Sequence, residues 1–260
     1  MKLTVDEIRF FKEYGYLIKR NVLNEALMAE ARERLWHFLP KGRSPQKPNS
    51  LIGPFSEAEE DRSHPNEIYK FRVNYRSIGQ EPWMVRLLAK DPNVWNMAEQ
   101  MLGKECLQEP DRIRGIYCTL PFGNHPKPSL TCHVDGHPFH LGVVGYIDDV
   151  APTGGSFTVW PGSHKQFYYA FNSQYKHERN EEYSMICEYY NGHQPVDCFG
   201  EAGDIVFWHH RLAHMASPNS TCNIRQAVLY DFKKTNIKEA ELDPPQEDMW
   251  QDWSSGIRDA

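Results

Sequence analysis

Signals for helices and signals for strands occupy different parts of this chain, and that order limits the possible folds more than any other feature. Amphipathic helical patterns fall within the first 105 residues. After them come short β-branched and aromatic runs bounded by Gly, Pro and Asn, which predict strands at 113–120, 140–148, 156–160, 204–208 and 224–232. Helices followed by strands predict an α+β fold, mainly β, in which helices pack on antiparallel sheets.

Three helices are expected in the first part of the chain. Thr4 and Glu7 have the spacing of a capping box, which places the start of the first helix. A second helix is predicted over about 24–40 and a third over 83–102. Between these two helices, residues 40–65 are rich in Pro, Gly, Ser and charged residues. This composition predicts a long loop that is either functional or mobile.

The composition excludes several classes of protein. Of the 260 residues, 40% are hydrophobic, which is enough for a sizeable core and argues against a disordered chain. The net charge of −6 argues against a nucleic-acid or anionic-membrane surface. No apolar run approaches the ~20 residues that span a bilayer, and no secretory signal is evident. The six cysteines form no C-x-x-C pair, so we expect free thiols in a reducing, cytoplasmic location.

Residues 165–198 differ in composition from the rest of the chain. They carry eight aromatic residues among many charges, which is too aromatic for a linker. We interpret the segment as an insertion that folds over another part of the protein. The alternative is that it only decorates the surface. The aromatic residues are Phe167, Tyr168, Tyr169, Phe171, Tyr175, Tyr183, Tyr189 and Tyr190.

Two histidine clusters predict a metal site. His133 and Asp135 are two residues apart, so on a strand the imidazole and the carboxylate point to the same face. The cluster at 208–214 can supply a third ligand, for which His214 is the first candidate. Two histidines and one carboxylate leave three coordination positions open, an arrangement that suits non-haem Fe(II) oxygen chemistry. The alternative is that these histidines are hydrogen-bonded core residues.

Arg225 follows His214 by eleven residues, with turn-forming residues at 217–220 between them. We therefore expect His214 and Arg225 on adjacent strands of one hairpin. By alternation Arg225 shares a face with Ala227 and Leu229, which marks that face as interior. A buried arginine requires an anion, and a bound dicarboxylate would satisfy it by bidentate pairing. A distant aspartate is the alternative partner.

These features together resemble the phytanoyl-CoA dioxygenase family of Fe(II)/2-oxoglutarate-dependent oxygenases. The resemblance covers most of the chain and rests on motifs that occur in the family's order. They are the opening 3–17 followed by 22–23, the His-x-Asp pair at 133–135, the Gly-Gly to Pro-Gly-Ser-His stretch at 154–164, the strand 203–207 before His214, and Arg225 eleven residues after that histidine.

The resemblance implies a fold and a chemistry. The fold is a double-stranded β-helix, or jelly-roll, buttressed by helices. His133, Asp135 and His214 would bind Fe(II), and Arg225 would pair with the far carboxylate of 2-oxoglutarate. With O2, the enzyme would oxidise a small metabolite or natural-product intermediate and release succinate and CO2. Because Asp135 is a carboxylate, where the halogenating subset has a small residue, hydroxylation or another oxidative step is expected.

The resemblance also suggests further co-substrate residues and a division of the chain. Related enzymes often place Ser or Thr where this chain has Ala216, so Ser217 beside it is assigned to the co-substrate, together with Thr158, Tyr117 and Lys70. We expect a single domain over 1–260, as a monomer or homodimer. Its parts are a helical region 1–105, a jelly-roll core 106–235 with a lid-like insertion 165–198, and a tail 236–260. A zinc hydrolase and a non-catalytic jelly-roll binding module are the alternatives.

Overall fold

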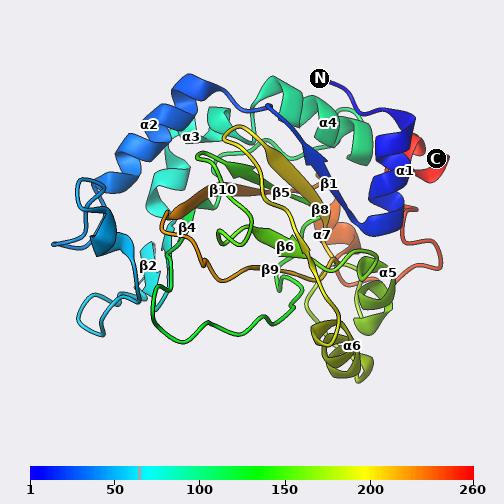
Figure 1. Cartoon of the computed structure of the whole chain (residues 1–260). Helices are drawn as coiled ribbons and strands as arrows, with labels where there is room; N and C mark the ends of the chain where they lie inside the picture. The colour runs from blue at the N-terminus through cyan, green and yellow to red at the C-terminus, as the bar shows by residue number, and fades with distance from the viewer. Residues whose placement is uncertain (64–65) are drawn as a thin grey trace.

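The computed structural model describes residues 1–63 and 66–260 and contains two antiparallel sheets (Figure 1). The larger sheet has the order β1-β8-β5-β10-β4-β3-β2. Its strands are β1 Tyr16–Lys19, β2 Asn66–Tyr69, β3 Arg72–Tyr75, β4 Gly115–Thr119, β5 Leu141–Tyr146, β8 Ile205–His209 and β10 Arg225–Phe232. The smaller sheet has the order β7-β6-β9, with β6 Phe157–Val159, β7 Val196–Asp197 and β9 His214–Ala216.

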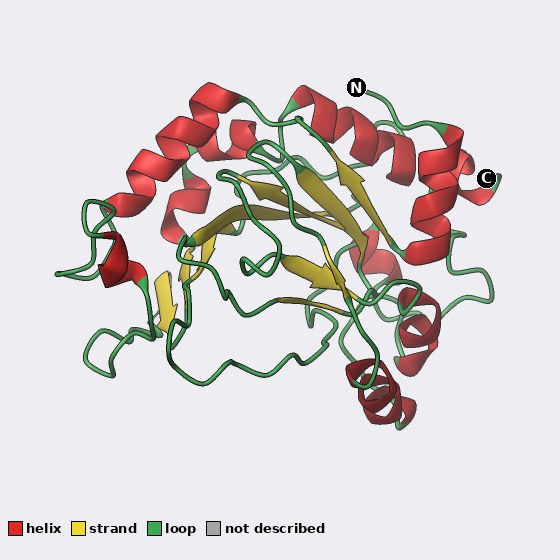
Figure 2. Ribbon diagram, viewed as in Figure 1, coloured by secondary structure: helices red, strands yellow, loops and turns green. Residues whose placement is uncertain are grey.

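The helices gather on the outer face of the larger sheet and at one end of the smaller one (Figure 2). The first group consists of α1 Val5–Tyr14, α2 Glu25–Trp36, α3 Pro82–Leu87 and α4 Pro92–Leu102. The second group is α5 His164–Phe167 and α6 Glu182–Asn191. Two short helices, α7 Ile237–Ala240 and α8 Ser255–Arg258, follow the last strand. The 3₁₀ turns are η1 Pro48–Leu51, η2 Ser77–Gln80 and η3 Tyr168–Ala170.

Alternation along the strands divides the core into two layers. On β8, Ile205 and Phe207 pack under the helices, whereas Val206 and Trp208 point into the space between the sheets. That inner space is filled by aromatic and β-branched side chains, among them Phe157 from the smaller sheet. The expected mainly-β α+β fold is therefore confirmed, and each of the five predicted strands overlaps an observed one.

The first predicted helix is confirmed in detail, but the third is wrong. Thr4 and Glu7 form the expected capping box at the start of α1. The predicted helix 83–102 is instead two helices, α3 and α4. The break occurs because Pro92 lacks the backbone donor that a helix interior requires and disfavours helical geometry at Asp91. The Asp91 side chain then accepts hydrogen bonds from two backbone N–H groups and caps α4. The second helix ends at Trp36, before residue 40.

The predicted hairpin joining His214 to Arg225 is also wrong. His214 lies on β9, which pairs with β6 in the smaller sheet, whereas Arg225 begins β10 in the larger sheet. The segment between them crosses from one sheet to the other. Asn219 holds this crossing through hydrogen bonds from its amide to the Thr119 and Asn223 carbonyls. Both strands nevertheless face the same inner space.

The expected tail 236–260 packs into the core. Trp253 lies with its ring centroid 5.6 Å from that of Phe11 and stacks on His209 at 5.2 Å. The Ser254 hydroxyl, which also caps α8, donates to the Gln100 carbonyl at 2.6 Å. This segment therefore joins α1, α4 and β8. Among the described residues no helix is long and apolar enough to cross a membrane, and all six cysteines are free.

Replacing Trp253 with alanine tests the contribution of this segment to stability. Trp253 is 3% exposed, so Trp253→Ala should lower the free energy of unfolding by about 3–5 kcal/mol through lost burial and a residual cavity. Urea denaturation followed by circular dichroism measures the change. Leu242, which is 59% exposed in the same segment, provides the control, because Leu242→Ala should change stability by only about 0.5 kcal/mol. Equal losses in the two variants would contradict this packing.

Candidate functional site

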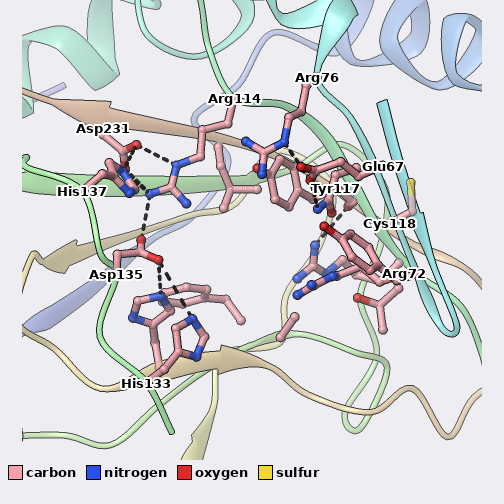
Figure 3. A pocket seen from close by; sticks show the side chains of 18 residues that line it. Glu67, Arg72, Arg76, Arg114, Tyr117, Cys118, His133, Asp135, His137 and Asp231 are labelled. Atoms are coloured by element: carbon pink, nitrogen blue, oxygen red, sulfur yellow. Dashed lines mark hydrogen bonds and ion pairs between the residues drawn. The ribbon is translucent and has the colours of Figure 1, made fainter. Parts of the chain in front are cut away.

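Three potential metal ligands converge at one edge of the inner space. The backbones of His133 and His214 exchange two hydrogen bonds, N to O at 3.2 and 2.9 Å, in an isolated bridge between the two segments. Asp135 follows in the loop, outside any strand. Its Oδ1 lies 3.9 Å from Nε2 of His133 and 3.7 Å from Nε2 of His214 (Figure 3). The potential ligand atoms of all three residues lie within 4.8 Å of one another.

The protonation states of these residues suit a cation. Nδ1 of His214 lies 2.9 Å from the Leu212 carbonyl, to which it can donate, and this leaves the Nε2 lone pair free. Desolvation, followed by the neighbouring His214, lowers the pKa of His133 to about 4, so this ring is neutral at neutral pH. Burial alone would raise the pKa of Asp135, but the Arg114 guanidinium and His214 outweigh burial and hold that pKa well below its ordinary value. Two imidazoles and one carboxylate are a ligand set that fits a divalent metal ion.

A second set of possible ligands, Asp135, His137 and Asp231, fits a metal less well. Nη2 of Arg114 lies 2.7 Å from a carboxylate oxygen of each aspartate and 2.9 Å from His137. A guanidinium therefore already satisfies both carboxylates, and its positive charge disfavours a cation in the same place.

The three residues open into a cavity of about 430 Å³ between the sheets. Alternation makes its lining polar, because β2, β3, β4 and the ends of β10 turn polar and charged side chains inward. The lining residues are Glu67, Tyr69, Arg72, Asn74, Arg76, Arg114, Tyr117, Cys118, Thr119, His133, Asp135, His137, Phe157, His214, Ala216, Arg225, Leu229 and Asp231.

Arg225 is a buried cation in this cavity, as the sequence predicted. It is 4% exposed, and it shares its strand face with the lining residues Leu229 and Asp231. Its Nε donates to the Gly155 carbonyl at 2.8 Å and its Nη1 to the Tyr117 carbonyl at 3.0 Å. Within the described part of the chain, no carboxylate lies at ion-pair distance from it. Burial lowers the pKa of Arg225, yet a guanidinium stays charged at neutral pH. The remaining donors can therefore bind an anion.

The other predicted co-substrate residues divide into two groups. Tyr117 lines the cavity, as does Ala216. Lys70 lies in the turn after β2 with its ammonium over the Phe71 ring. The Thr158 side chain is buried beside Ser156, and Ser217 is also buried away from the lining. The structure therefore brings Tyr117 to Arg225 but does not bring Lys70, Thr158 or Ser217 to the cavity.

Sequence reasoning missed most of the charged lining. Arg72 and Glu67 come from the β2–β3 hairpin, where no strand was predicted, and Arg76 follows it directly. Arg76 pairs with Glu67 at 2.8 Å, whereas Arg72 has no carboxylate at ion-pair distance among the described residues. Asp231 could have been found, because extending the alternation of Arg225 by three steps reaches it. No local sequence pattern marked Arg114 as a residue of the cavity lining.

The insertion 165–198 supports the segment that carries the first two ligands. The Tyr183 hydroxyl accepts a hydrogen bond from the Val134 N–H at 3.3 Å, and Oδ1 of Asn191 accepts one from the Cys132 N–H at 2.8 Å. Nδ1 of His177 lies 3.2 Å from the Asp135 carbonyl. No described residue of the insertion lines the cavity, and its role as a lid stays a prediction.

The comparisons with known proteins agree on the family and the fold. The sequence profile of the family described as Phytanoyl-CoA dioxygenase (PhyH) matches residues 11–227. None of the curated proteins compared with this sequence is significantly similar to it.

Solved structures similar to this chain include three enzymes. The non-haem α-ketoglutarate-dependent carbocyclase SnoK from nogalamycin biosynthesis is 20% identical, with a TM-score of 0.61 over 95% of each chain. EctD from S. alaskensis with bound Fe is 17% identical, with a TM-score of 0.56 over 94% of this chain and 80% of that one. The α-ketoglutarate-dependent epimerase SnoN, also from nogalamycin biosynthesis, is 20% identical, with a TM-score of 0.55 over 94% and 90%.

These neighbours share the double-stranded β-helix fold that the sequence resemblance implied, with helices against the larger sheet. The family match spans most of the chain and includes the segments that carry the candidate metal ligands and Arg225. The chain therefore belongs to the phytanoyl-CoA dioxygenase (PhyH) family.

Proposed function

We propose that this chain is an Fe(II)- and 2-oxoglutarate-dependent dioxygenase that oxidises a small polar metabolite or natural-product intermediate. The observation that carries the proposal is Arg225, a buried guanidinium without a carboxylate partner among the described residues, in the same cavity as a metal-fitting His133, Asp135 and His214. Membership of the PhyH family, and structural neighbours that are α-ketoglutarate-dependent or have bound Fe, support it.

Each residue has a defined part in this proposal. When bound, Fe(II), 2-oxoglutarate and O2 supply an oxidation of the substrate that is coupled to release of succinate and CO2. His133, Asp135 and His214 would hold the metal at the edge of the cavity. Arg225 would pair with the far carboxylate of 2-oxoglutarate. The Gly155 and Tyr117 carbonyls fix the guanidinium in place.

The cavity lining supports a polar substrate. Four arginines, two aspartates and one glutamate line it, while Phe157, Leu229, Ala216 and Cys118 provide the apolar part. A long acyl chain would cover these charged groups without offering a hydrogen-bond partner to Arg72, at a cost in desolvation. Arg72, which has no carboxylate beside it, offers donors to an anionic or hydroxylated group. A zinc hydrolase would make no use of Arg225, a buried guanidinium that has no carboxylate partner among the described residues.

The metal assignment is tested by His214→Ala. Because this change removes one of three ligands, the variant should bind no stoichiometric Fe(II) and should not turn over 2-oxoglutarate. Anaerobic titration with Fe(II) and 2-oxoglutarate measures binding through the weak visible charge-transfer band of the chelate, and succinate release in air measures turnover. His193→Ala is the control, because His193 is exposed and hydrogen-bonds to the Tyr189 carbonyl. If His214→Ala kept one iron per chain, the third ligand would have to be another residue.

The co-substrate assignment is tested by Arg225→Met, which keeps bulk but removes the donors. Breaking one side of a buried charge pair typically loses about 2–5 kcal/mol, or roughly thirty- to several-thousand-fold in 2-oxoglutarate affinity. Iron affinity should change little, because Arg225 is not a ligand. Calorimetric titration of the iron-loaded variant with 2-oxoglutarate gives the affinity for the co-substrate, and a thermal melt gives the stability. Wild-type affinity would refute the assignment, and a large stability loss with normal affinity would indicate a structural role instead.

A further inference from the structure

The two carboxylate oxygens of Asp135 face different partners. Oδ1 faces the Nε2 atoms of His133 and His214, at 3.9 and 3.7 Å. Oδ2 instead accepts a hydrogen bond from Nη2 of Arg114 at 2.7 Å. Figure 3 shows Arg114 above the carboxylate and His133 below it. One oxygen is thus presented to the metal position, while a cation holds the other.

Arg114 is itself held firmly in place. Its Nε and Nη2 donate to the two oxygens of Asp231, at 2.6 and 2.7 Å, in a bidentate pair. His137 lies 2.8 Å from the same carboxylate, and the Arg114 backbone N–H donates to the Leu229 carbonyl. The Arg114 side chain is only 16% exposed. Burial opposes its charge, but Asp135 and Asp231 outweigh burial and raise the pKa of Arg114.

Neutralising Asp231 does not account for the whole arrangement. One guanidinium balances one carboxylate, and the bidentate pair with Asp231 already does this. The further bond from Nη2 extends to Asp135, so two carboxylates share one cation and a formal charge of −1 is left over. The remaining negative charge lies on Asp135, whose Oδ1 faces the two histidines. A divalent cation bound between these three residues would offset that charge.

We propose that Arg114 is a positioning residue that limits Asp135 to one metal-binding oxygen. The inference rests on the proposed function. A carboxylate that binds through both oxygens takes two coordination positions, whereas one that binds through a single oxygen takes one. With Oδ2 occupied by Arg114, the three residues use three of six positions and leave three open. Because 2-oxoglutarate needs two of these, the Arg114 bond preserves the place of the co-substrate.

The test uses a double variant, Arg114→Met with Asp231→Asn, which removes the guanidinium and its main counter-charge together. The formal charge of the protein is unchanged, and no buried Asp231 carboxylate is left unpaired. The probe is Co(II), whose visible absorption reports the number and arrangement of its ligands. We expect a folded variant that binds Co(II) with an altered spectrum and about 10–100-fold more weakly, the usual effect of losing a partner of a metal ligand, and that also binds 2-oxoglutarate more weakly than the wild type.

The neighbouring pair in the same cavity gives a matched control. Arg76→Met with Glu67→Gln removes an ion pair of 2.8 Å that does not contact a candidate metal ligand. This variant should keep the wild-type Co(II) spectrum. The same spectral change in the control would mean that cavity charge alone matters, and would overturn the positioning role.

The remaining outcomes separate the two proposals. If the wild type binds neither Co(II) nor 2-oxoglutarate, the proposed function fails, and the role of Arg114 fails with it. If the wild type binds both, and the folded Arg114→Met/Asp231→Asn variant matches it in spectrum and affinity, only the role of Arg114 is overturned. A thermal melt of each variant establishes that it is folded before binding is compared.

Discussion

The register of one strand, β10, determines the positions of both charged ends of the site. β10 pairs with β5 on one side and β4 on the other, so its register is fixed twice. Its inward face carries Arg225 at one end and Asp231 at the other, about 20 Å apart at ~3.3 Å per residue. A slip of one residue would turn both into the helical layer. The buried cation Arg225 and the anchor of Arg114 therefore depend on the same backbone hydrogen bonds.

The sequence predicts this site only where neighbours along the chain carry the information. The pair His133 and Asp135, and the step from His214 to Arg225, are local patterns, and the structure places all four residues around one cavity. The failed hairpin shows the limit, since turn-forming residues after His214 do not specify which sheet the next strand joins. The break before α4 was readable from Pro92. The place of Arg114 in the site could not be predicted, because it depends on pairing between strands that are far apart in the sequence.

The ligand segment depends on contacts from outside the two sheets. His133 makes only an isolated bridge, and Asp135 lies in a loop, so strand pairing alone does not fix them. Hydrogen bonds from α6 and the preceding loop, through Tyr183 and His177, provide the missing restraint. The aromatic insertion 165–198, which the sequence led us to interpret as a cover, thus supports the ligand segment. Its buried rings pack against that segment.

The pairing of β1 with β8 has a consequence for synthesis of the protein. Tyr16 lies opposite Trp208, so an early strand finds its partner only after about 190 further residues have been made. At roughly 5–20 residues per second, that interval is about 10–40 s. Until then β1 has no strand to pair with, and Leu17, which pairs with Phe207 and is later buried, lacks its partner. Folding on the ribosome therefore has to wait for β8, and exposure to aggregation is longest for the residues made first.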